Sequence, residues 1–132
     1  MKCLGISSTL TSRPLNTAVR QGSAVTLRCS SDVSDSVILW YNSLCVTTTD
    51  TSGCTGDLIY NGFSIGNNFP STYVVTPGDN ATHVTRDLSI TSTQLTDAGV
   101  HLCAEQVAGI GIQEYSSSQL IVLGNYYSSI IT

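Results

Sequence analysis

Basic residues are scarce in this chain. Lysine and arginine together number five among 132 residues, and nine acidic residues bring the formal net charge to −4. The five cations are scattered along the sequence, so they form no basic stripe that could follow a phosphate backbone or dock on an anionic membrane. We therefore expect no nucleic-acid partner.

Long apolar runs are missing as well. No stretch approaches the roughly 20 apolar residues that a membrane helix needs, and the opening MKCLGISSTLTSRPL lacks the apolar core of a signal peptide. We therefore interpret the chain as a processed ectodomain or an expressed fragment, with any membrane anchor of the parent protein outside it.

Residues for catalysis or metal binding are sparse. The only histidines, His83 and His101, are far apart, and the acidic residues fall mostly in what we interpret as solvated turns. A catalytic site needs a nucleophile with a base, paired carboxylates or a metal. We therefore expect no enzymatic activity, no catalytic residue, no metal site and no cofactor.

Strand patterns dominate what is present. In SAVTLRC, Val25, Leu27 and Cys29 alternate with Thr26 and Arg28, as in a half-buried antiparallel strand. DLSIT and QLIVL alternate in the same way, and at least six or seven such runs occur. A chain of this length fits one domain, so the pattern predicts an all-β fold of two packed sheets.

A tryptophan lies between two strand cysteines. Cys29 closes VTLRC, Trp40 follows in VILWY, and Cys103 closes DAGVHLC. With GSAVTLRC, ILWY, DLIYNG, DLSITSTQLTDAGVHLC and SSSQLIVLG, the chain resembles an immunoglobulin V-set domain, in particular an antigen-receptor-like variable domain with a joining-like G strand.

The resemblance implies a V-type β-sandwich with Greek-key topology, in which Trp40 packs on a Cys29–Cys103 disulfide. It also implies room for C′ and C″ strands. The domain would span residues 8–124. Residues 1–7 would then be an N-terminal extension or residues added for expression, and residues 125–132 a C-terminal linker or tag.

Two core positions depart from the family pattern. Asp97, Gly99 and Cys103 are kept, but His101 replaces the usual tyrosine. We interpret His101 as a structural substitute that donates to a backbone carbonyl, with a pH-sensitive joint as the alternative. The family's usual arginine partner for Asp97 is Thr72 here, so we expect Asp97 to pair with Arg86 or to remain solvated.

Cys45 and Cys54 enclose an insertion between the expected C and C′ strands. A zinc site would need further ligands, and no Cys-x₂-Cys or His-x₃-His spacing occurs; a redox pair usually has Cys-x-x-Cys beside a helix. The ends of neighbouring antiparallel strands can come within disulfide distance, so we expect a Cys45–Cys54 bridge. Two bridges imply an extracellular or cell-surface location, and Cys3 is left to pair between chains or stay free.

The triplet NAT at Asn80–Thr82 is a glycosylation sequon in what we interpret as the turn between strands D and E. A glycan on Asn80 would be exposed there and would agree with secretion.

Alternation also indicates which side chains could bind a partner. If Ile38, Trp40, His101 and Cys103 point inward, their neighbours point outward from the sheet of strands G, F, C and C′. The expected outward apolar set is Leu39, Tyr41, Leu102, Tyr60 and Tyr115. The hairpin between strands F and G adds Val107, Ile110 and Ile112.

By resemblance, this face and hairpin would bind a protein partner or a second copy of the chain, as in an immune-type or cell-adhesion receptor. The same tyrosines could instead serve local packing, and a structural spacer without a binding role is the alternative.

Overall fold

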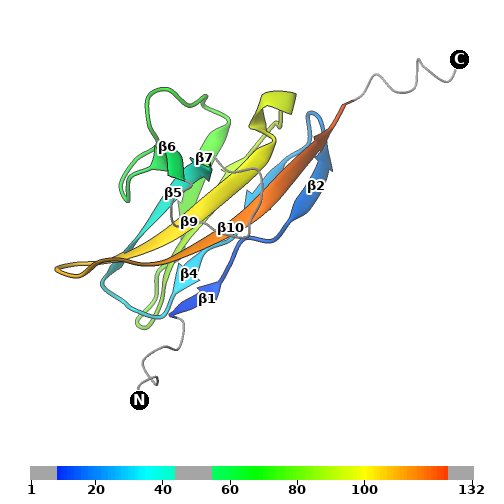
Figure 1. Cartoon of the computed structure of the whole chain (residues 1–132). Helices are drawn as coiled ribbons and strands as arrows, with labels where there is room; N and C mark the ends of the chain where they lie inside the picture. The colour runs from blue at the N-terminus through cyan, green and yellow to red at the C-terminus, as the bar shows by residue number, and fades with distance from the viewer. Residues whose placement is uncertain (1–8, 44–54, 125–132) are drawn as a thin grey trace, which may run out of the picture.

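A computed structural model describes residues 9–43 and 55–124 and forms a sandwich of two sheets (Figure 1). This confirms the expected all-β sandwich. The strands of the first sheet are β1 (Leu10–Ser12), β3 (Val25–Leu27), β4 (Ser30–Ser31), β7 (Tyr73–Pro77) and β8 (Val84–Ile90). The central strand is β8, which pairs with β3 and β4 along one edge and with β7 along the other.

The second sheet has the order β2-β10-β9-β5-β6. Its strands are β2 (Thr17–Arg20), β5 (Ser36–Ser43), β6 (Thr55–Tyr60), β9 (Gly99–Val107) and β10 (Gly111–Leu123). A 3₁₀ helix, η2 (Leu95–Asp97), precedes β9. Between β6 and β7 residues 61–72 form an isolated bridge, Tyr60–Ile65, and no strand, so the expected C″ strand is absent from this interval.

The amino-terminal strand is divided between the sheets. Its first segment, β1, pairs with β4, whereas β2 pairs in parallel with the end of β10. Asn16 strengthens the second attachment, because its Oδ1 accepts a 2.8 Å hydrogen bond from the Gln119 N–H, 103 residues away in sequence. One short segment therefore borders both layers of the sandwich (Figure 1).

The expected alternation is present in the strands. Val25 and Leu27 are buried in the core, while Thr26 and Arg28 are exposed. On β5, Ile38 and Trp40 enter the same core. Two-residue periodicity thus correctly predicts which side chains fill the space between the sheets.

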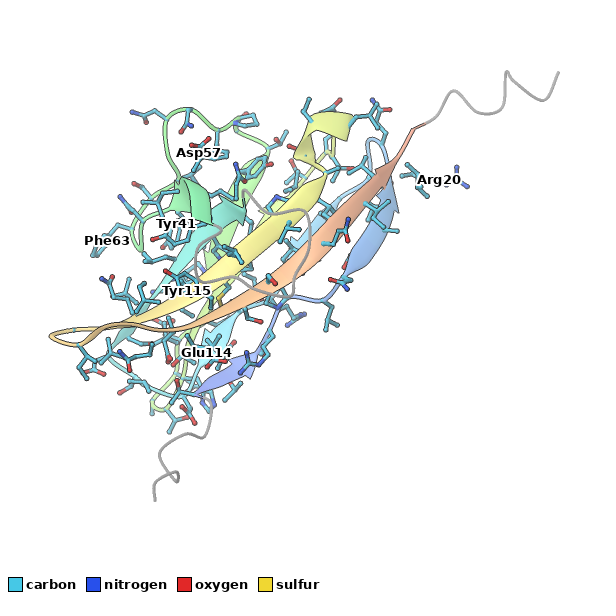
Figure 2. The ribbon with its side chains drawn as sticks, viewed as in Figure 1. Arg20, Tyr41, Asp57, Phe63, Glu114 and Tyr115 are labelled. Carbon is cyan, nitrogen blue, oxygen red and sulfur yellow. A yellow bond between two sulfur atoms is a disulfide. The ribbon has the colours of Figure 1, made fainter. Side chains whose placement is uncertain are left out.

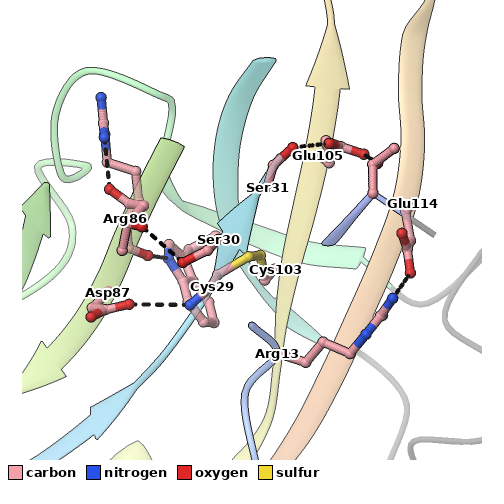
Figure 3. Close-up of a disulfide and its surroundings, with 12 residues drawn as sticks. Arg13, Cys29, Ser30, Ser31, Arg86, Asp87, Cys103, Glu105 and Glu114 are labelled. Atoms are coloured by element: carbon pink, nitrogen blue, oxygen red, sulfur yellow. Dashed lines mark hydrogen bonds and ion pairs between the residues drawn. A yellow bond between two sulfur atoms is a disulfide. The ribbon is translucent and has the colours of Figure 1, made fainter. Parts of the chain in front are cut away.

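The disulfide between Cys29 and Cys103 joins the sheets, with a Cα–Cα distance of 6.4 Å (Figure 3). Trp40 lies opposite Cys103 in the register of β5 and β9, and its Nε1–H donates a 2.8 Å hydrogen bond to the Arg86 carbonyl of β8. The bridge confirms the expected pairing and is compatible with an immunoglobulin-like domain. A buried disulfide also fits a secreted or extracellular domain.

Candidate functional site

One face of the second sheet carries Trp40 and Cys103, and the opposite face is called the outer face below. The strand register determines which side chains lie together on the outer face. Leu39 pairs with Ala104, and Tyr41 pairs with Leu102. On the other side of β9, Ala104 pairs with Tyr115. Sequence alternation therefore correctly placed Leu39, Tyr41, Leu102 and Tyr115 on one face.

The prediction that this face exposes its aliphatic side chains is wrong. Leu102 is 0% exposed and Leu39 is 7% exposed. Neither side chain can therefore contact a partner without local rearrangement.

Tyr60 is also placed differently from the prediction. It pairs with Trp40 in the ladder and belongs to the hydrophobic core between the sheets. Its phenol reaches the following loop, where it donates a 3.2 Å hydrogen bond to the Gly62 carbonyl.

The loop after β6 explains part of the burial on β5. A Cβ added at Gly62 would lie 2.5 Å from Cγ1 of Val37 and 3.7 Å from Cδ2 of Leu39, so the loop backbone packs directly on these two side chains. Gly62 has φ +98°, a conformation that glycine adopts at little cost. A loop distant in sequence from β5 thus covers one end of its outer face.

Gly62 offers a test of this contact. We expect Gly62→Ala to lower the free energy of unfolding by about 2 kcal/mol, because it adds a clash with Val37 to the strain of positive φ. The matched control is Gly22→Ala, at φ +90° with no atom within 4 Å of the added Cβ, for which we expect about 1 kcal/mol. Urea unfolding of both variants measures the difference, and equal losses would contradict close packing of the loop on β5.

Tyr41 and Tyr115 remain partly accessible on the outer face (Figure 2). Burial, and to a smaller extent the neighbouring Tyr115, raises the pKa of the Tyr41 phenol above its ordinary value. The Tyr41 phenol is therefore neutral at pH 7. Tyr41 and Tyr115 are the polar-tipped aromatic groups that this face offers to a partner.

The hairpin between β9 and β10 exposes its apolar tip. Ile110 is 69% exposed, and Val107 and Ile112 are half-buried at its base. Gly109 and Gly111 have positive φ values of 79° and 103°, and the Ile110 N–H donates a 3.0 Å hydrogen bond to the Val107 carbonyl. The glycines thus form a tight turn, with Ile110 at its end.

Phe63 is an exposed aromatic residue that the sequence analysis missed. It is 86% exposed in the loop after β6, where its N–H and that of Ser64 each donate a 2.9 Å hydrogen bond to Asn61 Oδ1. This loop lies on Val37, which is paired with Gln106 beside the hairpin. Phe63 and Ile110 therefore belong to loops at the same end of the sandwich, called the end loops below (Figures 1 and 2).

Glu105 lies beneath this end, not in a solvated turn. It is 0% exposed on β9, and its carboxylate accepts hydrogen bonds from the hydroxyls of Thr9 and Ser31 (Figure 3). Its neighbour on β10, Glu114, forms an ion pair with Arg13. A buried carboxylate thus connects the second sheet to the amino-terminal strand and to β4 of the first sheet.

The expectation that Asp97 pairs with Arg86 or remains solvated is also wrong. Asp97 is buried and accepts 2.7 Å hydrogen bonds from the Tyr73 hydroxyl and the Gln94 N–H. Arg86 instead forms an ion pair with Asp79, which lowers the pKa of the Asp79 carboxyl. No pattern in the sequence identifies the Tyr73 hydroxyl as the partner, because its position depends on how β7 faces η2.

Asn80 is exposed in the turn between β7 and β8, and its Oδ1 accepts 2.9 Å hydrogen bonds from the N–H groups of Thr82 and His83. Its glycosylation stays a prediction. Cys3, Cys45 and Cys54 lie outside the described residues.

The described side chains contain no group of three or more histidine, cysteine, aspartate or glutamate residues that could hold a metal ion. Across residues 9–43 and 55–124, no helix is long and apolar enough to cross a bilayer. Neither a scan against models of known protein families nor a search of curated proteins finds a match to this chain.

Proposed function

We propose that this chain is a V-set immunoglobulin recognition domain of an extracellular or cell-surface receptor of the immune or adhesion type. It works by protein–protein contact through its end loops and the tyrosine-bearing part of the outer face. It has no catalytic role, and its first partner is a second copy of the same chain.

One observation carries this proposal: two apolar side chains, Ile110 and Phe63, protrude from two loops at the same end of the sandwich, and hydrogen bonds fix the backbone of each loop. Large apolar residues presented together on rigid loops are typical of binding hot spots. The flanking side chains are small or polar, as in adaptable recognition loops. The disulfide and the Trp40 core support the V-set assignment, because they hold the sheets that position these loops.

The half-buried phenols extend the binding surface. Tyr41 and Tyr115 lie on β5 and β10, the strands that flank β9, whose far end carries the hairpin. A partner that covers Ile110 can therefore continue along the outer face to the two phenols. Leu39 and Leu102 lie beside these tyrosines on the outer face but are buried, and they do not contact the partner in this proposal.

Self-association gives the most direct test. We expect the wild-type chain to form a concentration-dependent dimer, and Ile110→Asp to weaken its association at least about tenfold, because a charge at the interface centre would be desolvated. Light scattering over a concentration range measures the mass, with Leu15→Asp as matched control because Leu15 is also highly exposed but lies between β1 and β2.

A dimer that forms equally well with Ile110→Asp would move the interface away from the end loops. A monomer at every concentration would exclude self-recognition, and the chain displayed as a multimer would then be tested for binding to a panel of cell types. If the chain neither dimerises nor binds any cell type, the structural spacer is favoured. The burial of Leu39 and Leu102 supports that alternative, because it reduces the exposed apolar surface.

A further inference from the structure

A cavity of about 340 Å³ lies at the end of the sandwich opposite the end loops. Its walls come from both sheets and from η2, and include Asn42 of β5, Tyr73 of β7 and His101 of β9. The volume lies at the lower end of the range for small-molecule pockets and suits one side-chain-sized group.

The wall of this cavity contains a buried carboxylate without a counter-ion. Asp97 is 8% exposed, and its two 2.7 Å hydrogen bonds come from neutral donors, the Tyr73 hydroxyl and the Gln94 N–H. Each oxygen can still accept another hydrogen bond. Among the described side chains no lysine, arginine or histidine forms a salt bridge with Asp97, although buried carboxylates are normally paired.

His101 adds a second unmatched polar atom. It is 3% exposed, and its Nδ1 has no hydrogen-bond partner in the part of the chain that the structure describes. Burial lowers the pKa of the imidazole, while the Gly99 carbonyl and the Asp97 charge partly oppose this shift. The ring is therefore neutral at pH 7, and one of its nitrogens can act only as an acceptor.

The rest of the lining is largely apolar. Phe69, Pro70 and Val100 contribute to the wall beside the polar groups. The Tyr73 hydroxyl donates to Asp97, and its oxygen can itself accept a hydrogen bond, so it adds a third acceptor. The cavity thus combines a negatively charged cluster of acceptors with an apolar wall.

We propose that this cavity binds a guanidinium or ammonium group carried on an aliphatic chain. Such a head group supplies the several N–H donors and the positive charge that Asp97, Tyr73 and His101 lack. Its aliphatic stem packs along Phe69, Pro70 and Val100, as lysine and arginine stems do on apolar surfaces. The Asp97 carboxylate would repel an anion. A neutral hydrogen-bond donor would leave the negative charge of Asp97 without a counter-ion.

The cation can be a free small molecule or a side chain of another protein, and two probes separate these sources. Agmatine represents the free guanidinium, and N-acetyl-arginine amide represents a protein side chain. N-acetyl-citrulline amide, which has nearly the same shape without the charge, is the matched control.

The first experiment follows the imidazole nitrogens of His101 by NMR in the wild-type chain. We expect agmatine or the arginine amide to shift these resonances saturably, and the citrulline amide to leave them unchanged. Binding by agmatine favours a free ligand; binding by the arginine amide alone favours a protein side chain. No shift with either cation up to about 10 mM, well above a millimolar Kd, or an equal shift with citrulline, would overturn the proposal.

A pair of carboxylate variants tests the role of the charge. We expect Asp97→Asn to weaken the binding of the cation at least about tenfold, whereas Asp79→Asn, which removes the exposed carboxylate beside Arg86, leaves it unchanged. If Asp97→Asn does not fold, Tyr73→Phe removes one acceptor and should weaken binding less than Asp97→Asn would. Unchanged affinity in the folded Asp97→Asn or Tyr73→Phe protein would contradict the site.

The pH dependence provides an independent check in the wild-type chain. The titratable groups that face His101 are Asp97 of η2 and Tyr73 of β7; the phenol remains neutral because burial and Asp97 raise its pKa. We expect cation binding to weaken as the pH falls below the lowered pKa of His101, because an imidazolium ion competes for Asp97. Affinity that stays constant as the pH falls through the range in which His101 is protonated would exclude His101 from the site. The cavity is remote from the end loops, so this test is independent of the proposed receptor function.

Discussion

Replacing Cys29 and Cys103 together by alanine is expected to lower the free energy of unfolding by about 4.5 kcal/mol in the chain-entropy model. The bridge joins two fully buried cysteines 74 positions apart in sequence, and its removal enlarges the set of unfolded conformations. Because domains of this size are only marginally stable, the variant should be largely unfolded near 37 °C. Thermal unfolding followed by circular dichroism measures the loss.

The matched control is the double substitution Cys45→Ser with Cys54→Ser. The loop that this pair would close is much shorter, so its predicted contribution is smaller, about 2.5–3 kcal/mol in the chain-entropy model. A larger loss of stability from this pair than from Cys29 and Cys103 would show that the short loop, and not the bridge between the sheets, limits folding.

Glu105→Ala is expected to be the second most disruptive change, at about 2–4 kcal/mol. The substitution removes a fully buried carboxylate, leaves the hydroxyls of Thr9 and Ser31 without their acceptor and opens a void beside them. Chemical denaturation gives the loss directly. Hydrogen exchange should show the opening concentrated in β1 and β4, the segments that Glu105 contacts.

Two controls separate the causes of this effect. Glu105→Gln keeps the shape and one acceptor oxygen, so it should recover part of the lost stability. Glu114→Ala removes the carboxylate directly opposite on β10, where the partly exposed ion pair with Arg13 should contribute less than about 1 kcal/mol. Comparable losses of unfolding free energy in Glu105→Ala and Glu114→Ala would contradict the larger contribution that we expect from the buried carboxylate of Glu105.

Alternation along strands predicted the all-β sandwich and the face on which many strand side chains lie, whereas the Cys29–Cys103 pairing was implied by the resemblance to a known family. Alternation correctly placed Trp40 in the core and both Tyr41 and Leu102 on the other face, because neighbouring side chains on a strand point in opposite directions. It did not predict the burial of Leu39, because this side chain is covered by Gly62, and such contact between segments leaves no periodic signal in the sequence.

The polar interior was the least predictable part of the molecule. Glu105 and Asp97 belong to a residue type that is usually solvated, and their burial depends on hydroxyl groups at Thr9, Ser31 and Tyr73. Thr9 and Ser31 lie 96 and 74 residues from Glu105, and Tyr73 lies 24 residues from Asp97, so the match arises only after the sheets have packed. Phe63 was missed for a related reason: its exposure depends on the path of the loop after β6.

The divided amino-terminal strand has a consequence for the order of folding during synthesis. The ribosome makes β2 early, but the strand that completes its hydrogen bonding is the end of β10, and the Asn16–Gln119 contact spans 103 residues. Contacts between residues so far apart in sequence form late, since the intervening chain must be synthesised and its two ends brought together first. The second sheet therefore keeps an unpaired border while the nascent chain emerges. A chaperone that holds extended segments would protect Thr17–Arg20 until the last residues of β10 leave the exit tunnel.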